Sequence, residues 1–210
     1  MNPLTYHYRF EPGTVASAPP LLLLHGTGGD ENDLVPLAAR LAPGSALLSP
    51  RGDVNEHGQL RFFRRLAEGV FDPAEVAERA HALADFVGAA AARHGLDRAR
   101  LIALGLSNGA NIATALLWLR PETLAGAVLF RPMVVLEPDH RPDLRDKRVL
   151  VSSGSADPIV PADHPARLAR RLREAGARVD LRIHAAGHGL VPGDLAAARE
   201  FLGPAGPTPS

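Results

Sequence analysis

Short apolar runs alternate with amphipathic stretches along the whole chain. Runs such as 21–24 and 125–130 contain no polar alternation, which is typical of strands buried on both faces of a sheet. The stretches between them repeat apolar residues at helical spacing. The pattern predicts strands at 4–10, 21–24, 46–49, 100–106, 125–130, 148–153 and 178–184. It predicts helices at 34–41, 72–94, 108–119, 164–175 and 194–201.

A regular alternation of strand and helix predicts an α/β fold, in which a mainly parallel sheet of about seven strands has helices on both faces. We expect a single domain over residues 1–203 and a flexible C-terminal tail, G-P-A-G-P-T-P-S, whose residues 204–210 lie outside it. There is no internal repeat, and the elements use up the chain, so no separate lid domain is expected.

The longest connection, residues 51–71, is predicted to be a loop that serves function, because loops of this length are otherwise disordered and Phe62 and Phe63 argue against disorder. The two phenylalanines either line a substrate pocket or pack in the core. Four arginines of this loop either form an anion site near the cleft or are solvated or paired within the chain, and the second alternative is favoured. They are Arg51, Arg61, Arg64 and Arg65.

Candidate chemistry begins at Gly105-Leu-Ser107-Asn-Gly109, between a predicted strand and a predicted helix. In that context G-x-S-x-G forms a sharp elbow that exposes the serine at the end of a sheet. A serine hydroxyl needs a base and an orienting acid to act as a nucleophile. Asp157 and His188 follow Ser107 in the chain order of α/β-hydrolases, each in the turn after a strand. The sequence therefore predicts Ser107 as nucleophile, His188 as general base and acid, and Asp157 as the residue that orients the imidazole.

An oxyanion hole requires two preorganised N–H donors. The backbone of Asn108 is one candidate, because it directly follows the nucleophile at a helix N-terminus. The backbone of Thr27 is the other, because H-G-T-G-G after the strand 21–24 resembles the oxyanion turn of esterases. The candidates for the substrate pocket are Phe62, Phe63, Met133 and Leu190, although for Met133, as for Phe130 and Trp118, a place in the core is the favoured interpretation.

Composition excludes several other functions. The net charge is zero and the chain has no cysteine, so neither a basic nucleic-acid footprint nor a thiolate metal or redox site is expected. His184 and His188 flank a strand end, where they should not converge on a metal, and the glycines near residue 28 do not complete a nucleotide-binding motif. No apolar run reaches membrane-spanning length and no secretory signal is recognisable, so a cytoplasmic location is expected. We expect no cofactor and no metal.

The chain also resembles the phospholipase/carboxylesterase family of α/β-hydrolases, which includes acyl-protein thioesterases, and within it a bacterial subgroup of small carboxylesterase-like hydrolases, some linked to hydroquinone resistance. The resemblance rests on L-L-L-L-H-G-T-G-G-D-E-N-D-L, S-P-R-G, R-F-F-R-R-L-A-E-G-V-F-D, G-L-S-N-G-A-N, G-S-A-D-P-I-V-P and G-H. It implies an α/β-hydrolase fold, a cofactor-free serine esterase, and the same triad and oxyanion donors. Asn108 replaces the glutamine common in the thioesterases, and Arg131 replaces a histidine frequent in related hydrolases.

These departures favour a small soluble substrate over a palmitoylated protein. The sequence thus predicts a serine hydrolase that cleaves small or medium-chain carboxylic esters or thioesters through an acyl-enzyme at Ser107. Two alternatives stay open, a C–C bond or ring-fission-product hydrolase and a non-catalytic ligand-binding protein of the same fold. The expected partner is a small-molecule ester, and a homodimer is compatible with the sequence although no apolar stripe specifies one.

Overall fold

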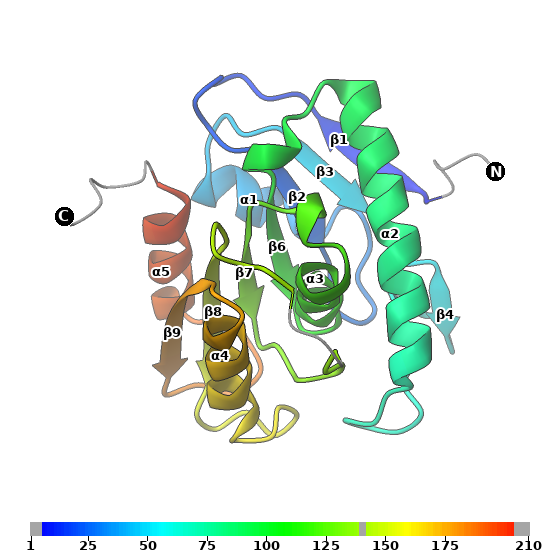
Figure 1. Cartoon of the computed structure of the whole chain (residues 1–210), viewed down its shortest axis with the longest axis vertical. Coiled ribbons are helices and arrows are strands. Elements are labelled where there is room, and N and C mark those ends of the chain that lie inside the picture. Colours follow the sequence, from blue (N-terminus) through cyan, green and yellow to red (C-terminus); the bar gives the residue numbers. More distant parts are fainter. Residues whose placement is uncertain (1–5, 139–141, 204–210) are drawn as a thin grey trace.

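A seven-stranded sheet forms the centre of the molecule in the computed structural model, which describes residues 6–138 and 142–203 (Figure 1). The strand order is β1-β3-β2-β6-β7-β8-β9, and only β1 runs antiparallel to its neighbour. The strands are β1 (Tyr8–Glu11), β2 (Leu21–Leu24), β3 (Leu47–Pro50), β6 (Ile102–Leu106), β7 (Gly126–Phe130), β8 (Arg148–Gly154) and β9 (Arg178–His184). The predicted mainly parallel sheet of about seven strands is confirmed.

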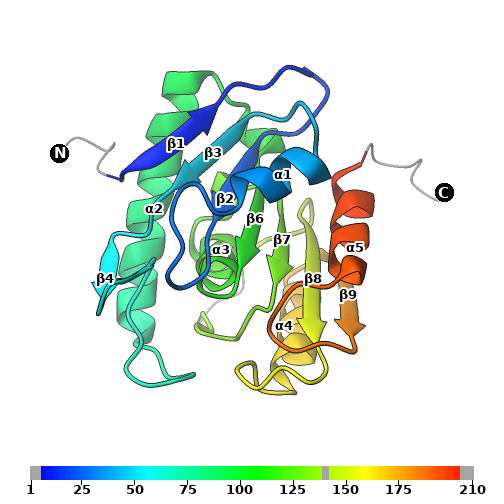
Figure 2. The ribbon, with the colours of Figure 1, turned by 180° about the vertical axis from the view of Figure 1, so that it is seen from behind.

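Helices cover both faces of this sheet. They are α1 (Val35–Leu41), α2 (Pro73–His94), α3 (Asn108–Leu119), α4 (His164–Glu174) and α5 (Pro192–Leu202). The helices α2, α3 and α4 lie on the face seen in Figure 1, whereas α1 and α5 lie on the opposite face, seen in Figure 2. The helix α2 begins at its cap Asp72, whose carboxylate accepts the N–H of Ala74 at 2.9 Å, and it ends at Gly95 with φ 67°.

The core forms two clusters, one on each side of the sheet. Leu22 and Leu24 belong to the cluster under α2, α3 and α4, while Leu21 and Leu23 belong to the cluster under α1 and α5. Successive side chains of a strand point to opposite faces, so a strand covered on both sides needs apolar residues at every position. This requirement explains the unbroken leucine run of β2.

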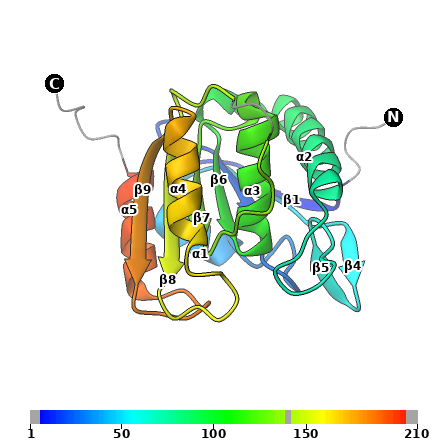
Figure 3. The ribbon, with the colours of Figure 1, turned by 60° about the horizontal axis from the view of Figure 1, so that its bottom comes forward.

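The segment 51–71 contains regular structure that the sequence analysis did not predict. Within it, β4 (Val54–Glu56) and β5 (Gln59–Arg61) pair as a hairpin. His57 and Gly58 form its turn with φ values of 54° and 88°, the positive values that a tight hairpin turn requires. The segment lies beside the first turns of α2 (Figure 3), and its Asp53 forms an ion pair with Arg79 of that helix. The predicted long loop therefore begins with a short hairpin that was not expected, and only its remainder, residues 62–71, is without a named strand or helix.

The domain boundaries predicted from the sequence, one domain over residues 1–203 and a tail over 204–210, stay predictions. The tail and residues 4–5 of the first expected strand lie outside the described residues. Over the described ranges, no helix is both long enough and apolar enough to cross a membrane.

Candidate active site

The predicted chemical groups gather at one edge of the sheet. The parallel strands β2, β6, β8 and β9 all end at this edge (Figure 2), and Thr27, Ser107, Asp157 and His188 follow them in turn. Ligands of open α/β sheets bind outside the carboxyl ends of the strands, so this edge is where a site is expected.

Ser107 occupies the sharp turn between β6 and α3 with φ 52° and ψ −114°, a backbone conformation that residues other than glycine rarely adopt. Two glycines permit this turn because no side chain would fit at either position. A Cβ atom on Gly109 would lie 1.9 Å from the carbonyl oxygen of Leu24, and one on Gly105 would lie 2.7 Å from the backbone of Ala110. The Ser107 N–H donates to the carbonyl of Phe130 at 2.8 Å, which ties the elbow to β7.

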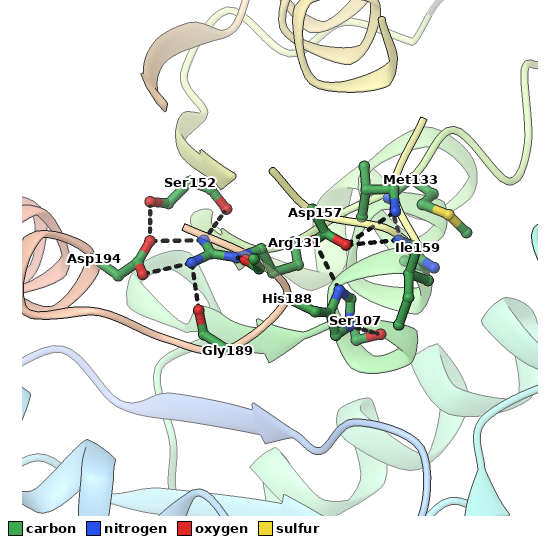
Figure 4. Close-up of polar contacts among 12 residues, drawn as sticks. Ser107, Arg131, Met133, Ser152, Asp157, Ile159, His188, Gly189 and Asp194 are labelled. Carbon is green, nitrogen blue, oxygen red and sulfur yellow. Dashed lines mark hydrogen bonds and ion pairs between the residues drawn. The ribbon is translucent and has the colours of Figure 1, made fainter. Parts of the chain in front are cut away.

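A continuous chain of hydrogen bonds joins the three residues predicted as the triad (Figure 4). The hydroxyl of Ser107 lies 3.0 Å from Nε2 of His188, and Nδ1 of His188 lies 2.8 Å from Oδ2 of Asp157. These residues are 81 and 31 positions apart in sequence, so the fold alone brings them together.

The environment of Asp157 fixes which nitrogen of His188 carries the proton. The carboxylate is buried, with 1% of its side chain exposed, and burial by itself would raise its pKa. Hydrogen bonds from the N–H of Ile159 at 2.8 Å, from His188 and from the N–H of Val160 outweigh burial, so the pKa of Asp157 lies below its ordinary value. An ionised carboxylate only accepts, so Nδ1 of His188 donates to it and Nε2 is left to accept the Ser107 proton.

The two predicted oxyanion donors lie at the same cavity as Ser107. Thr27 and Asn108 both line it. Asn108 is the first residue of α3, where a backbone N–H has no acceptor within the helix. The side chain of Thr27 is held by Arg61, whose Nη1 donates to its hydroxyl at 2.5 Å. Their role as donors to an oxyanion stays a prediction.

The cavity above Ser107 has a volume of about 440 Å³. Met133 and Leu190 line it together with the apolar side chains of Phe71 and Ile159, and their contact with a substrate stays a prediction. Phe62 and Phe63 do not line it, because their side chains are at most 1% exposed and pack in the core under α2. Their placement in the substrate pocket is therefore corrected, and Phe71 supplies the aromatic ring there. A second cavity, at the opposite ends of the strands, contains none of the predicted catalytic residues.

Two asparagines of α3 shape the walls of this cavity, a role that the sequence analysis missed. The side-chain carbonyl of Asn108 accepts the N–H of Phe62 at 2.8 Å, and that of Asn111 accepts the N–H of Met133 at 2.7 Å. The elbow helix thus holds both the 51–71 segment and the turn after β7. The recurrence of asparagine in S-N-G-A-N was the available sequence signal.

His25 has a similar supporting role. Its Nε2 accepts the N–H of Gly52 at 2.9 Å, and its ring lies 4.8 Å from that of Phe62. Burial lowers the pKa of His25, so the ring is neutral and can accept this bond.

The arginines of the 51–71 segment are paired within the chain, as the favoured interpretation predicted. Arg51 binds Glu31 through two hydrogen bonds of 2.5 and 2.7 Å. The remaining ion pairs join Arg61 and Glu56 at 3.7 Å, Arg64 and Glu75 at 3.3 Å, and Arg65 and Glu56 at 2.9 Å. Arg61 and Arg65 nevertheless line the cavity, and burial lowers the pKa of Arg61.

A buried ion pair stands behind the His188 turn. Arg131, directly after β7, and Asp194, in the first turn of α5, both have side chains that are 0% exposed. Asp194 stays ionised, because the hydrogen bonds from Arg131 and Ser152 outweigh burial and lower its pKa. In the sequence, Arg131 stands out only as a departure from a family pattern, and nothing marks Asp194.

No group of three or more histidine, cysteine, aspartate or glutamate side chains is arranged to hold a metal ion within residues 6–138 and 142–203. His184, which sequence spacing offered as a partner of His188, instead approaches Asp194 at 3.6 Å.

Comparison with known proteins bears on this geometry. Residues 56–196 match the dienelactone hydrolase family, a range that includes Ser107, Asp157 and His188. The chain belongs to the dienelactone hydrolase family. It is 42% identical to MhqD of Bacillus subtilis (strain 168) over 192 residues, which cover 91% of this chain and 95% of MhqD.

Two solved carboxylesterases of this fold are also similar. The enzyme from Bacillus cereus superposes with a TM-score of 0.91 at 41% identity, covering 94% of this chain and 93% of that one. The enzyme from Mesorhizobium loti has a TM-score of 0.89 at 37% identity, covering 97% and 98%. The α/β-hydrolase fold and the relationship to carboxylesterases that the motifs predicted are confirmed, and the chain is a hydrolase of this type.

Proposed function

We propose that this protein is a serine carboxylesterase that cleaves small or medium-chain carboxylic esters or thioesters through an acyl-enzyme on Ser107. The observation that carries the proposal is the hydrogen-bond chain from the Ser107 hydroxyl through His188 to the buried Asp157. A ligand-binding protein has no need for this series of hydrogen bonds, so its presence disfavours the non-catalytic alternative.

Acylation follows from the positions of these groups. The Ser107 oxygen attacks the ester carbonyl while its proton passes to Nε2 of His188. The tetrahedral oxyanion accepts hydrogen bonds from the N–H groups of Thr27 and Asn108. When the intermediate collapses, the bond to the leaving group breaks and His188 returns the proton to the departing alcohol or thiol. Asp157 stays ionised and stabilises the imidazolium that forms in between.

Deacylation repeats the sequence with water as the nucleophile. His188 takes a proton from the water as it attacks the acyl carbonyl, and it then returns that proton to Ser107 as the carboxylic acid leaves. The cycle consumes one water and needs no cofactor.

The walls of the cavity support a small substrate with both apolar and polar parts. Its volume of about 440 Å³ is within the range of small-molecule sites. Phe71, Met133 and Leu190 offer an apolar surface for an acyl chain. Thr27, Arg61 and Asn108 line the same cavity and offer polar groups to the carbonyl end of the substrate.

Covalent labelling tests the nucleophile. A fluorophosphonate probe should label the wild-type protein at Ser107 and leave Ser107→Ala unlabelled, and the substitution should lower ester turnover by about 10⁶-fold, as for serine hydrolases in which the nucleophile is removed. Ser155→Ala, an exposed serine in the turn before Asp157, is the matched control and should label normally. Labelling that persists in Ser107→Ala contradicts the assignment.

A series of p-nitrophenyl esters from acetate to palmitate then measures the length of the acyl pocket. We expect the highest kcat/KM for short and medium chains, because the cavity is small. Because the chain belongs to the dienelactone hydrolase family, a simple lactone belongs in the same series. A protein that takes up the fluorophosphonate but turns over none of these esters would contradict the proposed substrate class.

A further inference from the structure

The turn that carries His188 is held from behind by the buried guanidinium of Arg131. Its Nε donates to the carbonyl of Gly187 at 3.1 Å, and its Nη2 donates to the carbonyl of Gly189 at 2.7 Å. The two carbonyls belong to the residues on either side of His188. Figure 4 shows the guanidinium between this turn and Asp194.

The other donors of Arg131 complete a network without a spare N–H group. Nη1 and Nη2 bind the two carboxylate oxygens of Asp194, each at 2.8 Å, and Nη1 also reaches the carbonyl of Ser152 at 3.2 Å. All five N–H groups of the guanidinium are therefore used. Asp194 in turn accepts the hydroxyl of Ser152 at 2.6 Å and the N–H of Val191 at 2.7 Å.

The same residue is connected to the nucleophile through the backbone. The carbonyl of Phe130 accepts the N–H of Ser107, and Arg131 is the next residue, with its own N–H bonded to the carbonyl of Ser152 at 2.8 Å. The backbone φ of Arg131 is 54°, which is unusual for a residue other than glycine. One short stretch at the end of β7 therefore contacts both the serine turn and the histidine turn.

We propose that Arg131, with Asp194 as its counterion, is the positioning residue for His188. It sets the distance between the imidazole and the Ser107 hydroxyl by fixing the peptide groups at 187 and 189. Arg131 does not touch the reacting atoms and acts only through the turn. The inference rests on the proposed function, because it takes His188 as the general base.

The first experiment compares two changes at this network with a control elsewhere in the core. Arg131→Met combined with Asp194→Leu removes both charges together, so no unpaired ion is left buried. Arg131→Lys keeps the charge but concentrates its donors on one nitrogen, which cannot reproduce the planar fork. Leu83→Ala empties a buried position on α2 that does not line the cavity, and it controls for loss of stability.

We expect the double variant to lose about 10²-fold in kcat with KM changed by less than about threefold, because misplacement of a catalytic group by an ångström costs about that much. Arg131→Lys should fall between the double variant and wild type, and Leu83→Ala should keep the wild-type kcat per folded molecule. The proposal is overturned if the double variant loses no more kcat than Leu83→Ala. If the double variant does not fold, the same criterion applies to Arg131→Lys.

A second measurement does not depend on ester turnover. In wild type and in Leu83→Ala, the proton on Nδ1 of His188 should give a downfield NMR resonance, because it is hydrogen-bonded to Asp157. The resonance should be lost or broadened in the variants at Arg131. If wild type hydrolyses no ester, the proposed function fails while this measurement still decides the positioning. A resonance that is unchanged in the variants contradicts the role of Arg131 directly.

Discussion

The Ser107 elbow and the 51–71 segment line the same cavity, yet different forces hold them in place. The elbow is determined by short-range backbone packing, in which glycines at 105 and 109 let a strand, a turn and a helix approach more closely than any side chain would allow. The segment is held by side chains, through the core packing of Phe62 and Phe63, the bond from Phe62 N–H to Asn108 and the ion pair between Arg51 and Glu31. The comparison teaches that close backbone packing positions the nucleophile, whereas side-chain contacts position the segment that lines the cavity.

Among variants that leave Ser107 itself in place, the largest expected effect is on the catalytic side of this comparison and does not loosen the fold. Asp157→Asn should lower kcat by about 10⁴-fold, because the amide stabilises the wrong tautomer of His188. The free energy of unfolding should change little by comparison, since an asparagine carbonyl can still accept the N–H of Ile159. Steady-state kinetics and urea unfolding measure the two quantities. Asp163→Asn, an exposed position just before α4, is the control, and equal losses of kcat in both variants would contradict the role of Asp157.

The next effect concerns the 51–71 segment, where a substitution should lower stability and leave kcat nearly unchanged. Phe63→Ala should lower the free energy of unfolding by about 3–5 kcal/mol, because it leaves a cavity in the core where the Phe63 ring lies 5.4 Å from that of Phe71. The kcat of the folded fraction should stay within a few-fold of wild type. Leu66→Ala, whose side chain is 70% exposed in the same segment, should change stability by less than about 0.5 kcal/mol. A large loss of kcat at unchanged stability would mean that Phe63 contacts the substrate.

The smallest effect sharpens the picture of how the segment is anchored. Arg51 hydrogen-bonds Glu31, whose side chain is 8% exposed, and lowers the pKa of Glu31 from 4.5 to about 2. The folded-state pKa is depressed, so this pair stabilises the fold fully above about pH 4.5 and the contribution is lost as pH falls toward 2. Urea unfolding should show wild type about 1 kcal/mol more stable than Glu31→Gln at pH 7, a small value because Arg51 is partly exposed and screened. The difference should shrink between pH 4.5 and 3, and one that is constant with pH would contradict the assignment.

The residues around the elbow could be predicted from the sequence, whereas the structure of the 51–71 segment could not. Residues 107, 157 and 188 were placed at strand ends in the right order, and the structure brings their side chains into hydrogen-bond contact. Their roles stay predictions until the variants are measured. The hairpin at 54–61 was not predicted, because its strands of three residues leave too short a pattern to detect. Phe62 and Phe63 were pocket candidates with core packing as an open alternative, because an aromatic residue in a loop carries no sign of the direction in which it points.

The sequence by itself determined the alternation of strands and helices, the elbow at Ser107 and the order of its partners. Apolar period and glycine spacing are local and can be read from neighbouring residues. The order of the partners can be read along the chain without knowing how its elements pack. Only the tertiary structure decided that Phe71 rather than Phe62 lines the cavity, that Asn108 and Asn111 hold its walls, and that Arg131 meets Asp194 across 63 positions. Burial and long-range pairing depend on how the elements pack against one another, and the order of residues along the chain does not show which distant groups will meet.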